Sequence, residues 1–125
     1  MTPKHSLTAI LPCNNLRASA AFYAKLGFRI EGDHGHYLIL GDGKGADLHL
    51  TQAVEGWLIP GKNPFGLYLY CENVDELASA LGGLVLHKPE DKPWGMYEFA
   101  LSDPDETLVR VGWPTRLRRA NSSRS

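Results

Sequence analysis

Several features that define other classes of protein are missing from this sequence of 125 residues. No apolar run approaches the roughly 20 residues that cross a membrane, and Met1 to His5 contain no hydrophobic signal core. Two cysteines, Cys13 and Cys71, are too few for a disulfide framework. These absences favour a cytoplasmic protein with reduced thiols and disfavour a membrane as a partner.

Motifs of common catalytic chemistry are also missing. The chain has no Gly-rich phosphate-binding loop, and no Ser-His-Asp or Cys-His arrangement rises above chance. We therefore favour a binding protein over an enzyme.

Basic residues are few in most of the chain and concentrated at its C-terminal end. The formal net charge is −1, but four arginines and no acid lie in the last ten residues. The rest holds nine basic and fourteen acidic residues, which disfavours nucleic acid as a partner and tolerates a cationic ligand. We expect a single domain at residues 1–114 and a basic, disordered tail at residues 115–125, with a basic anchoring role as the less favoured alternative.

The first half of the chain has the pattern of a β-α-β-β-β module over residues 7–52. Asn15 suits the N-cap of a helix over residues 16–26, and Gly27 suits the position just after it. Short apolar runs and alternating residues predict strands at residues 7–11, 28–31, 37–40 and 46–51.

The second half repeats this order over residues 66–113. Residues 73–76 resemble a capping box before a helix that ends at Gly82. Strands are predicted at residues 67–70 and 84–87, and a β-hairpin is predicted between Trp94 and Val111, around Asp103-Pro104-Asp105-Glu106.

Two segments of the first half recur in the second, which supports a duplication. Residues 10–16 match residues 68–74, and residues 42–49 match residues 103–110. Neither half could bury enough surface alone. We therefore predict an α+β fold, in which two tandem modules form a curved mixed sheet around a cleft with the helices outside.

At this point the chain resembles the vicinal-oxygen-chelate superfamily, which includes glyoxalases, bleomycin-resistance proteins and extradiol dioxygenases. The resemblance rests on the duplication, on residues 16–28 and on residues 100–105, and it covers roughly residues 7–113. Within the superfamily, Leu11-Pro12 and Trp94-Gly95 resemble the bleomycin-resistance proteins. The resemblance implies the duplicated fold, whereas function needs arguments from the site itself.

The resemblance also indicates where a metal would bind. In the metalloenzymes of the superfamily, His and Glu ligands come from the first and last strands of each module. The matching positions here are Thr8, His49, Gly66 and Arg110. A divalent metal needs about three protein ligands, and an arginine repels the cation, so we expect no metal cofactor.

A second arrangement of histidines needs its own interpretation. His34 and His36 could clip a metal from alternate positions of a strand, with His49 or Asp33 nearby. The alternative, an exposed turn with two solvated imidazoles, is the simpler interpretation.

Strand alternation indicates which residues line the cleft. If Leu48 and Val109 face the helices, then His49 and Arg110 face the concave side. We expect the other residues on that side to be Tyr37, Ile39, Glu98, Ala100, Thr8, Ile10 and Tyr68. Arg110 is expected to pair across the hairpin with Glu98, either as a structural pair or to bind a polar ligand group.

Trp94 matches the tryptophan that lies at the drug-binding groove in the bleomycin-resistance family. Its indole could stack on a flat heteroaromatic ring, and Tyr37 could supply a second face. The alternative is a packed core or rim side chain. The predicted ligand-binding residues are therefore Trp94, Tyr37, His49, Tyr68, Glu98 and Arg110.

One residue departs from the family pattern. Relatives usually have glycine after Asp-Pro-Asp, whereas this chain has Glu106; the counterpart in the first module is Gly45. A left-handed glutamate would cost about 1 to 2 kcal/mol, which favours a different turn here.

The resemblance and the residues together predict a function. We expect metal-independent binding and sequestration of a small molecule such as a cationic aromatic antibiotic of the bleomycin type. The resemblance implies a homodimer, with Trp57 to Ile59 and Trp113 as candidate contacts. Two alternatives remain: a metal-dependent glyoxalase-, transferase- or dioxygenase-like enzyme that uses His49, and a metabolite-binding dimer unrelated to drug resistance.

Overall fold

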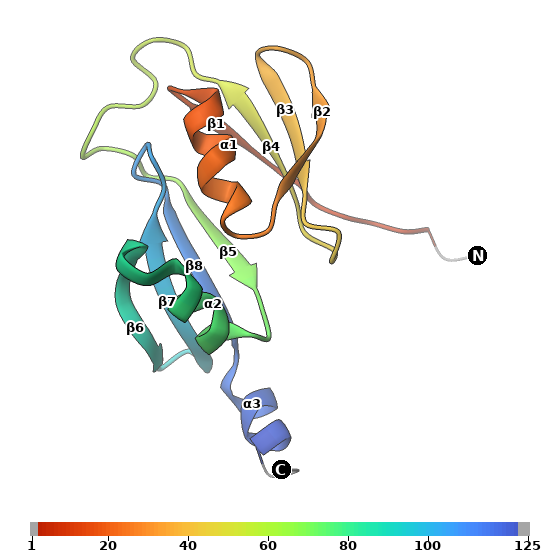
Figure 1. The fold of residues 1–125 in the computed structure, drawn as a ribbon, viewed down its shortest axis with the longest axis vertical. Helices are drawn as coiled ribbons and strands as arrows, with labels where there is room; N and C mark the ends of the chain where they lie inside the picture. Colours follow the sequence, from red (N-terminus) through yellow and green to blue (C-terminus); the bar gives the residue numbers. More distant parts are fainter. Residues whose placement is uncertain (1–2, 123–125) are drawn as a thin grey trace. The chain divides into compact units, whose positions relative to one another are not determined.

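The computed structural model describes residues 3–122, and its strands fall into two four-stranded mixed sheets (Figure 1). The chain divides into two compact units, residues 1–62 and residues 63–125. Each unit contains one predicted module, and the order β-α-β-β-β is confirmed in both. The predicted α+β class with two tandem modules is therefore confirmed.

The first unit is a sheet with one helix on its face. The sheet has the order β1-β4-β3-β2, with β1 parallel to β4 and the other pairs antiparallel. Its elements are β1 (Ala9–Cys13), α1 (Leu16–Ala24), β2 (Arg29–Asp33), β3 (Tyr37–Gly41) and β4 (Asp47–Gln52). The Asn15 side chain accepts a hydrogen bond of 3.0 Å from the Ala18 N–H, which confirms the predicted N-cap. Gly27 has the positive φ of +99° expected just after the helix.

Strand β1 differs from its prediction, because it begins later and runs through Pro12. A proline inside a strand removes one N–H from the ladder, which is why residues 7–11 were expected to form the strand. β1 is an edge strand of its sheet, and proline is tolerated there because one side of an edge strand forms no ladder bonds.

The second unit repeats the sheet with the order β5-β8-β7-β6. Its elements are β5 (Gly66–Tyr70), α2 (Val74–Leu81), a short 3₁₀ helix (Gly82–Leu84), β6 (Val85–Asp91), β7 (Met96–Ser102), β8 (Leu108–Pro114) and α3 (Thr115–Ser122). The predicted hairpin is confirmed as β7 and β8. Tyr68 pairs with Arg110 as Ile10 pairs with His49, so the two sheets have the same register at equivalent positions.

The predicted capping box before α2 is wrong. The Asn73 side chain makes no capping hydrogen bond, and its backbone has φ −88° and ψ 51°. An N-cap side chain reaches the first turn from an extended backbone, as at Asn15 with φ −126° and ψ 101°. Asp75 and Glu76 still lie in the first turn of α2, where the helix dipole favours acids.

The turn between the last two strands is built in the same way in both units. One carboxylate oxygen of Asp42 accepts the N–H groups of residues 44 and 46 at 2.8 and 2.9 Å. Asp103 does the same for residues 105 and 107, at 2.8 and 2.9 Å. Glu106 has φ +67° where Gly45 has φ +112°. The expectation of a different turn is therefore wrong. The hydrogen bonds to Asp103 hold the turn in the same shape, with Glu106 in the left-handed conformation that Gly45 has in the first unit.

The C-terminal segment also differs from its prediction. Residues 115–122 form helix α3 instead of a disordered tail. The Arg118 guanidinium lies over the Tyr97 ring, 3.4 Å from its centre, and is 3.5 Å from the Asp75 carboxylate. Thr115 donates a hydrogen bond of 2.8 Å to Asp91. These contacts with distant residues order a segment whose composition alone predicts disorder. Residues 123–125 lie outside the described part of the chain.

Each unit has its own apolar core between sheet and helix. Leu38, Leu40 and Leu50 are buried in the first unit, and Phe99 and Val111 are buried in the second. No helix in the described part of the chain is long and apolar enough to cross a membrane.

The segment between the two sheets carries exposed apolar side chains. Trp57 is 60% exposed and Ile59 is 50% exposed, whereas Leu58 between them is buried. Asn14 donates a hydrogen bond of 3.3 Å to the Leu58 carbonyl oxygen, which ties this segment to the end of β1. Leu58 therefore belongs to the core of its own unit, so that of the predicted contacts Trp57 to Ile59 it is Trp57 and Ile59 that are exposed. The other predicted contact, Trp113, is partly buried.

Candidate ligand-binding site

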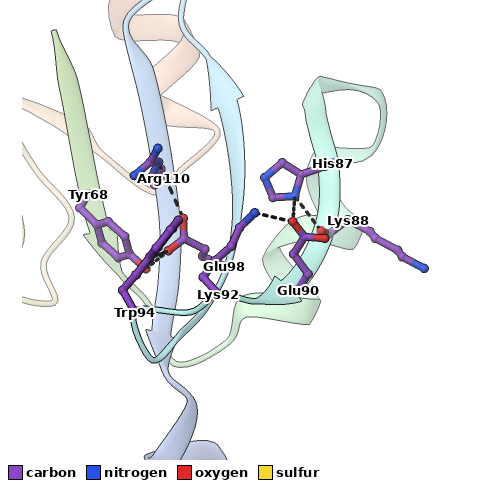
Figure 2. Close-up of polar contacts among 8 residues, drawn as sticks. All are labelled: Tyr68, His87, Lys88, Glu90, Lys92, Trp94, Glu98 and Arg110. Atoms are coloured by element: carbon purple, nitrogen blue, oxygen red, sulfur yellow. Dashed lines mark hydrogen bonds and ion pairs between the residues drawn. The ribbon is translucent and has the colours of Figure 1, made fainter.

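Four of the six predicted site residues meet on the second sheet (Figure 2). Glu98 lies at their centre on β7, with a side chain only 1% exposed. Its Oε1 accepts hydrogen bonds from Trp94 Nε1 at 2.7 Å and from the Tyr68 hydroxyl at 3.1 Å. Its Oε2 lies 3.7 Å from Arg110 Nε. We call Tyr68, Trp94, Glu98 and Arg110 the Glu98 cluster.

The register of the strands explains why these side chains meet. Arg110 lies opposite Ala100, and Glu98 lies opposite Gly112, so the two charged residues are diagonal neighbours on one face of the hairpin. The predicted Glu98–Arg110 pair is confirmed, with a diagonal geometry. Tyr68 reaches the same face because β5 runs beside β8 with Tyr68 next to Arg110.

Trp94 reaches the cluster from the turn between β6 and β7. The turn is closed by a hydrogen bond of 3.0 Å from the Gly95 N–H to the Lys92 carbonyl oxygen. Gly95 has φ +82°, a conformation that favours glycine. The turn at Trp94-Gly95 therefore brings the indole N–H within hydrogen-bond distance of Glu98, which lies four residues later in the chain.

Gly112 makes room for the cluster, and the sequence analysis missed it. A Cβ atom on Gly112 would overlap the Tyr68 hydroxyl and would lie 2.8 Å from both Glu98 Cβ and the Tyr97 carbonyl oxygen. Without a side chain there, Tyr68 can cross β8 to reach Glu98. Gly112 directly follows the predicted hairpin, and a glycine at the end of such a strand-like run is the signal that could have indicated this close approach.

The charges of the cluster are distributed unevenly between interior and surface. The Glu98 carboxylate is buried, whereas the Arg110 side chain is 45% exposed. Burial raises the pKa of Tyr68 above its usual range, and the hydrogen bond to Glu98 and the Glu98 charge raise it further. The phenol therefore stays protonated and keeps donating to the carboxylate throughout the physiological range.

Trp94 is half exposed and has cationic neighbours. It is 55% exposed, and the Arg110 guanidinium carbon lies 5.7 Å from its ring centre. Lys92 Nζ lies 5.9 Å from the same ring and forms an ion pair with Glu90. Lys92 was not among the predicted site residues, although its position two residues before Trp94 indicated that it could lie near the indole.

A pocket opens beside Trp94 in the same unit. Its volume is about 530 Å³, which falls in the size range of small-molecule sites. Asp91, Lys92 and Met96 line it from one side, and Thr115 and Arg116 line it from the start of α3. Helix α3 therefore contributes a wall that a disordered tail could not provide.

The other two predicted site residues form a pair on the first sheet. The Tyr37 hydroxyl lies 2.7 Å from His49 Nδ1, and the two rings meet edge to face at 5.3 Å. His49 lies opposite Ile39, so this pair is diagonal in the same way as Glu98 and Arg110. The equivalent positions thus hold a hydrogen-bonded Tyr–His pair in one sheet and a Glu–Arg ion pair in the other. A role for Tyr37 in stacking on the same ligand as Trp94 stays a prediction.

The residues at the positions of the superfamily's metal ligands do not fit a divalent metal. Arg110 is held against Glu98, and His49 uses Nδ1 in its contact with Tyr37. Within residues 3–122, no three His, Cys, Asp or Glu side chains lie close enough together to hold a metal ion. His34 and His36 are exposed, and the neighbouring Asp33 forms an ion pair of 2.9 Å with Arg17.

The chain is similar to known proteins in sequence and in fold. The model of the Glyoxalase/Bleomycin resistance protein/Dioxygenase superfamily matches residues 5–111. A bleomycin resistance protein from Klebsiella pneumoniae is 32% identical over 118 residues, which cover 83% of this chain and 88% of that protein.

Solved structures show the same relationship. A bleomycin-binding protein complexed with bleomycin is 28% identical and has a TM-score of 0.75, over 88% of this chain and 98% of that chain. A bleomycin resistance determinant encoded on the transposon Tn5 is also 28% identical with a TM-score of 0.75, over 89% of this chain and 98% of that chain. These matches confirm the fold and the resemblance inferred from the sequence.

Proposed function

Because this chain belongs to the glyoxalase/bleomycin resistance protein/dioxygenase superfamily, we propose that it binds and sequesters an aromatic small molecule of the bleomycin type. The observation that carries the proposal is the half-exposed Trp94, whose indole N–H is anchored on the buried Glu98. An anchored ring needs little ordering when a flat ligand stacks on it, so less binding energy is lost.

The proposal includes binding without a metal and without chemistry. Thr8, Gly66 and Arg110 stand at three of the four superfamily ligand positions, and none of them supplies a good ligand for a divalent cation. The Glu98 carboxylate, which could act as a base, already accepts from Trp94 and Tyr68. Its role is to position these side chains, and capture of the ligand is the whole activity.

Titration calorimetry of the chelator-treated protein with metal-free bleomycin tests the proposal. We expect saturation with submicromolar affinity, which corresponds to about −8 kcal/mol or better. Trp94→Leu should weaken binding at least tenfold, because stacking and apolar contact with the indole are lost. Phe65→Leu, a matched change at an aromatic residue that is 45% exposed, should leave the affinity unchanged.

The outcomes separate the alternatives. Absence of saturation would overturn the proposal for bleomycin-type ligands. Saturation that survives Trp94→Leu would show that the ligand lies elsewhere. Stoichiometric metal in the purified protein, together with catalytic turnover, would favour a metal-dependent enzyme. Binding of a metabolite but not of bleomycin would favour a metabolite-binding dimer unrelated to drug resistance.

We also propose that the protein is cytoplasmic, as the sequence analysis predicts, and that it forms a homodimer, as the resemblance implies. Trp57 and Ile59 support this because two large apolar side chains lie exposed two residues apart. Sedimentation equilibrium should give the mass of two chains, and Trp57→Ser with Ile59→Ser should shift it towards one. A single-chain mass for the unmodified protein at micromolar concentration would contradict the dimer.

A further inference from the structure

We propose that the pocket between Trp94 and α3 binds a neutral, hydroxylated group of the same ligand whose aromatic ring contacts Trp94. The pocket has a volume of about 530 Å³, and residues of the Trp94 turn and of α3 line it. The inference rests on the proposed function and adds a second part to the binding site. Any cationic group of the ligand lies outside this pocket.

The start of α3 is fixed to both ends of the turn that carries Trp94. The Thr115 N–H donates a hydrogen bond of 2.9 Å to the Gly95 carbonyl oxygen, and the Thr115 hydroxyl donates one of 2.8 Å to Asp91. Farther along α3, the contacts of Arg118 hold the helix against the second unit. The walls of the pocket are therefore in place before a ligand arrives, so little ordering is needed for binding.

The pocket presents one charged acceptor and one charged donor. Asp91 lines it from the end of β6, and Arg116 lines it from α3. Among the side chains that the structure describes, neither of the two has an ion-pair partner. A carboxylate only accepts hydrogen bonds, and a guanidinium only donates them. A charged ligand group would be attracted by one and repelled by the other, whereas hydroxyl groups can bond to both.

The third charged residue of the pocket is already compensated. Lys92 forms an ion pair with Glu90, towards which its side chain turns in Figure 2. The lining also includes Pro93, Met96 and Pro114, whose apolar surfaces suit the carbon skeleton of a hydroxylated ring. The pocket therefore combines a donor and an acceptor with apolar walls and has no excess of either charge.

Trp94 belongs to both parts of the site. Its half-exposed indole lines the pocket. The Arg110 guanidinium lies over the indole ring and covers part of one face. A ligand ring that contacts the rest of the exposed indole lies next to the pocket, so a substituent of that ring can enter it.

Three coumarins that share one flat ring system test the inference. 4-Methylumbelliferyl glucoside carries a neutral hydroxylated ring, the corresponding glucuronide adds a carboxylate to that ring, and 7-methoxy-4-methylcoumarin has no such ring. Each is titrated into isotope-labelled protein, and the indole N–H resonance of Trp94, assigned by its loss in Trp94→Phe, reports binding. We expect the glucoside to bind about five- to tenfold more tightly than the methoxy compound, because it gains hydrogen bonds in the pocket.

The glucuronide tests the preference for a neutral group. It should bind about two- to threefold less tightly than the glucoside, because its carboxylate loses water without a net gain in charge attraction. Equal affinity for the glucoside and the methoxy compound would overturn the inference. Failure of the glucoside to saturate the protein, or tighter binding of the glucuronide, would also overturn it.

Two variants of the pocket should change its charge preference in opposite directions. Asp91→Asn keeps an oxygen that can accept from Thr115 but leaves Arg116 uncompensated, so it should strengthen glucuronide binding about two- to fivefold. Arg116→Gln leaves Asp91 uncompensated and should weaken glucuronide binding by a similar factor. Lys88→Gln, a control at an exposed cation of β6 outside the pocket, should change no affinity.

The opposite signs identify the cause of these changes. Loss of folding would weaken binding in both variants, whereas the two pocket charges predict one gain and one loss. Glucuronide affinity that is unchanged in both variants, or that shifts in the same direction in both, would overturn the inference.

Bleomycin distinguishes failure of this inference from failure of the proposed function. If bleomycin binds and the glucoside has no advantage over the methoxy compound, the inference fails and the proposed function stands. If the glucoside binds through the pocket and bleomycin does not bind, the inference about the pocket stands and the ligand belongs to another chemical class.

Discussion

Replacement of Gly112 by alanine should destabilise the second unit, because the added methyl group has no room. Its Cβ would overlap the Tyr68 hydroxyl and would lie 2.8 Å from the Tyr97 carbonyl oxygen. Tyr68 can rotate away, which loses its hydrogen bond to Glu98, worth about 1 to 2 kcal/mol for a partly exposed donor to a charged acceptor. The backbone carbonyl cannot move as cheaply, and overpacking against it costs about 1 to 3 kcal/mol.

Urea unfolding followed by tryptophan fluorescence measures the effect. We expect Gly112→Ala to lower the free energy of unfolding by about 2 to 4 kcal/mol, equivalent to roughly 10 °C in Tm for a chain of this size. Gly83→Ala is the matched control, because a Cβ there meets no atom within 4 Å. Its free energy of unfolding should change by less than about 0.5 kcal/mol.

A double-mutant cycle tests the cause. In a Tyr68→Phe background the overlapping hydroxyl is absent, so Gly112→Ala should cost about 1 kcal/mol less than in the unmodified protein. Equal stability of Gly112→Ala and Gly83→Ala would refute the steric argument. Additive effects of Tyr68→Phe and Gly112→Ala would refute the specific role assigned to the Tyr68 hydroxyl.

Three further predictions concern single residues. Glu106→Gly should raise the free energy of unfolding by about 0.5 to 1 kcal/mol, because it relieves a left-handed glutamate at φ +67°; calorimetry showing a lower Tm would contradict this. Tyr68 has a pKa raised by burial and by Glu98, so its contribution to stability is complete below about pH 10 and lost as pH rises further. Stability should therefore fall more steeply above pH 10 in the unmodified protein than in Tyr68→Phe, and parallel pH profiles from urea unfolding would rule out this linkage. Arg118→Ala should cost about 1 kcal/mol and speed amide hydrogen exchange at the start of α3, whereas the exposed Arg116→Ala should not; equal exchange in both variants would argue against the Tyr97 contact as the anchor.

Much of the fold could be predicted because local patterns and duplication agree. The N-cap at Asn15 and the alternation in β4 and β8 depend on neighbouring residues, so they are readable from the sequence. The Glu98–Arg110 pair was predictable because alternation places both residues on one face of a hairpin.

The remaining features depend on contacts between residues far apart in the chain. Helix α3 is ordered by Asp75 and Tyr97, which no local pattern links to Arg118. The role of Gly112 depends on the reach of Tyr68 from a neighbouring strand. At Asn73 the sequence has the residue types of a capping box, but the backbone there is not extended enough for the side chain to cap. In such cases the sequence indicates which residues could form a cap or a contact, and the tertiary structure determines which of them do.

The equivalence of the Tyr37–His49 and Glu98–Arg110 pairs bears on how proteins of this design can diversify. The same strand register carries a Tyr–His pair in one sheet and a Glu–Arg pair in the other, so this position of the module accepts either kind of pair. A chain with two copies of such a position can alter one copy while the other keeps its original contacts. The duplication thus lets one module acquire a pair suited to a ligand while the equivalent pair in the other module is retained.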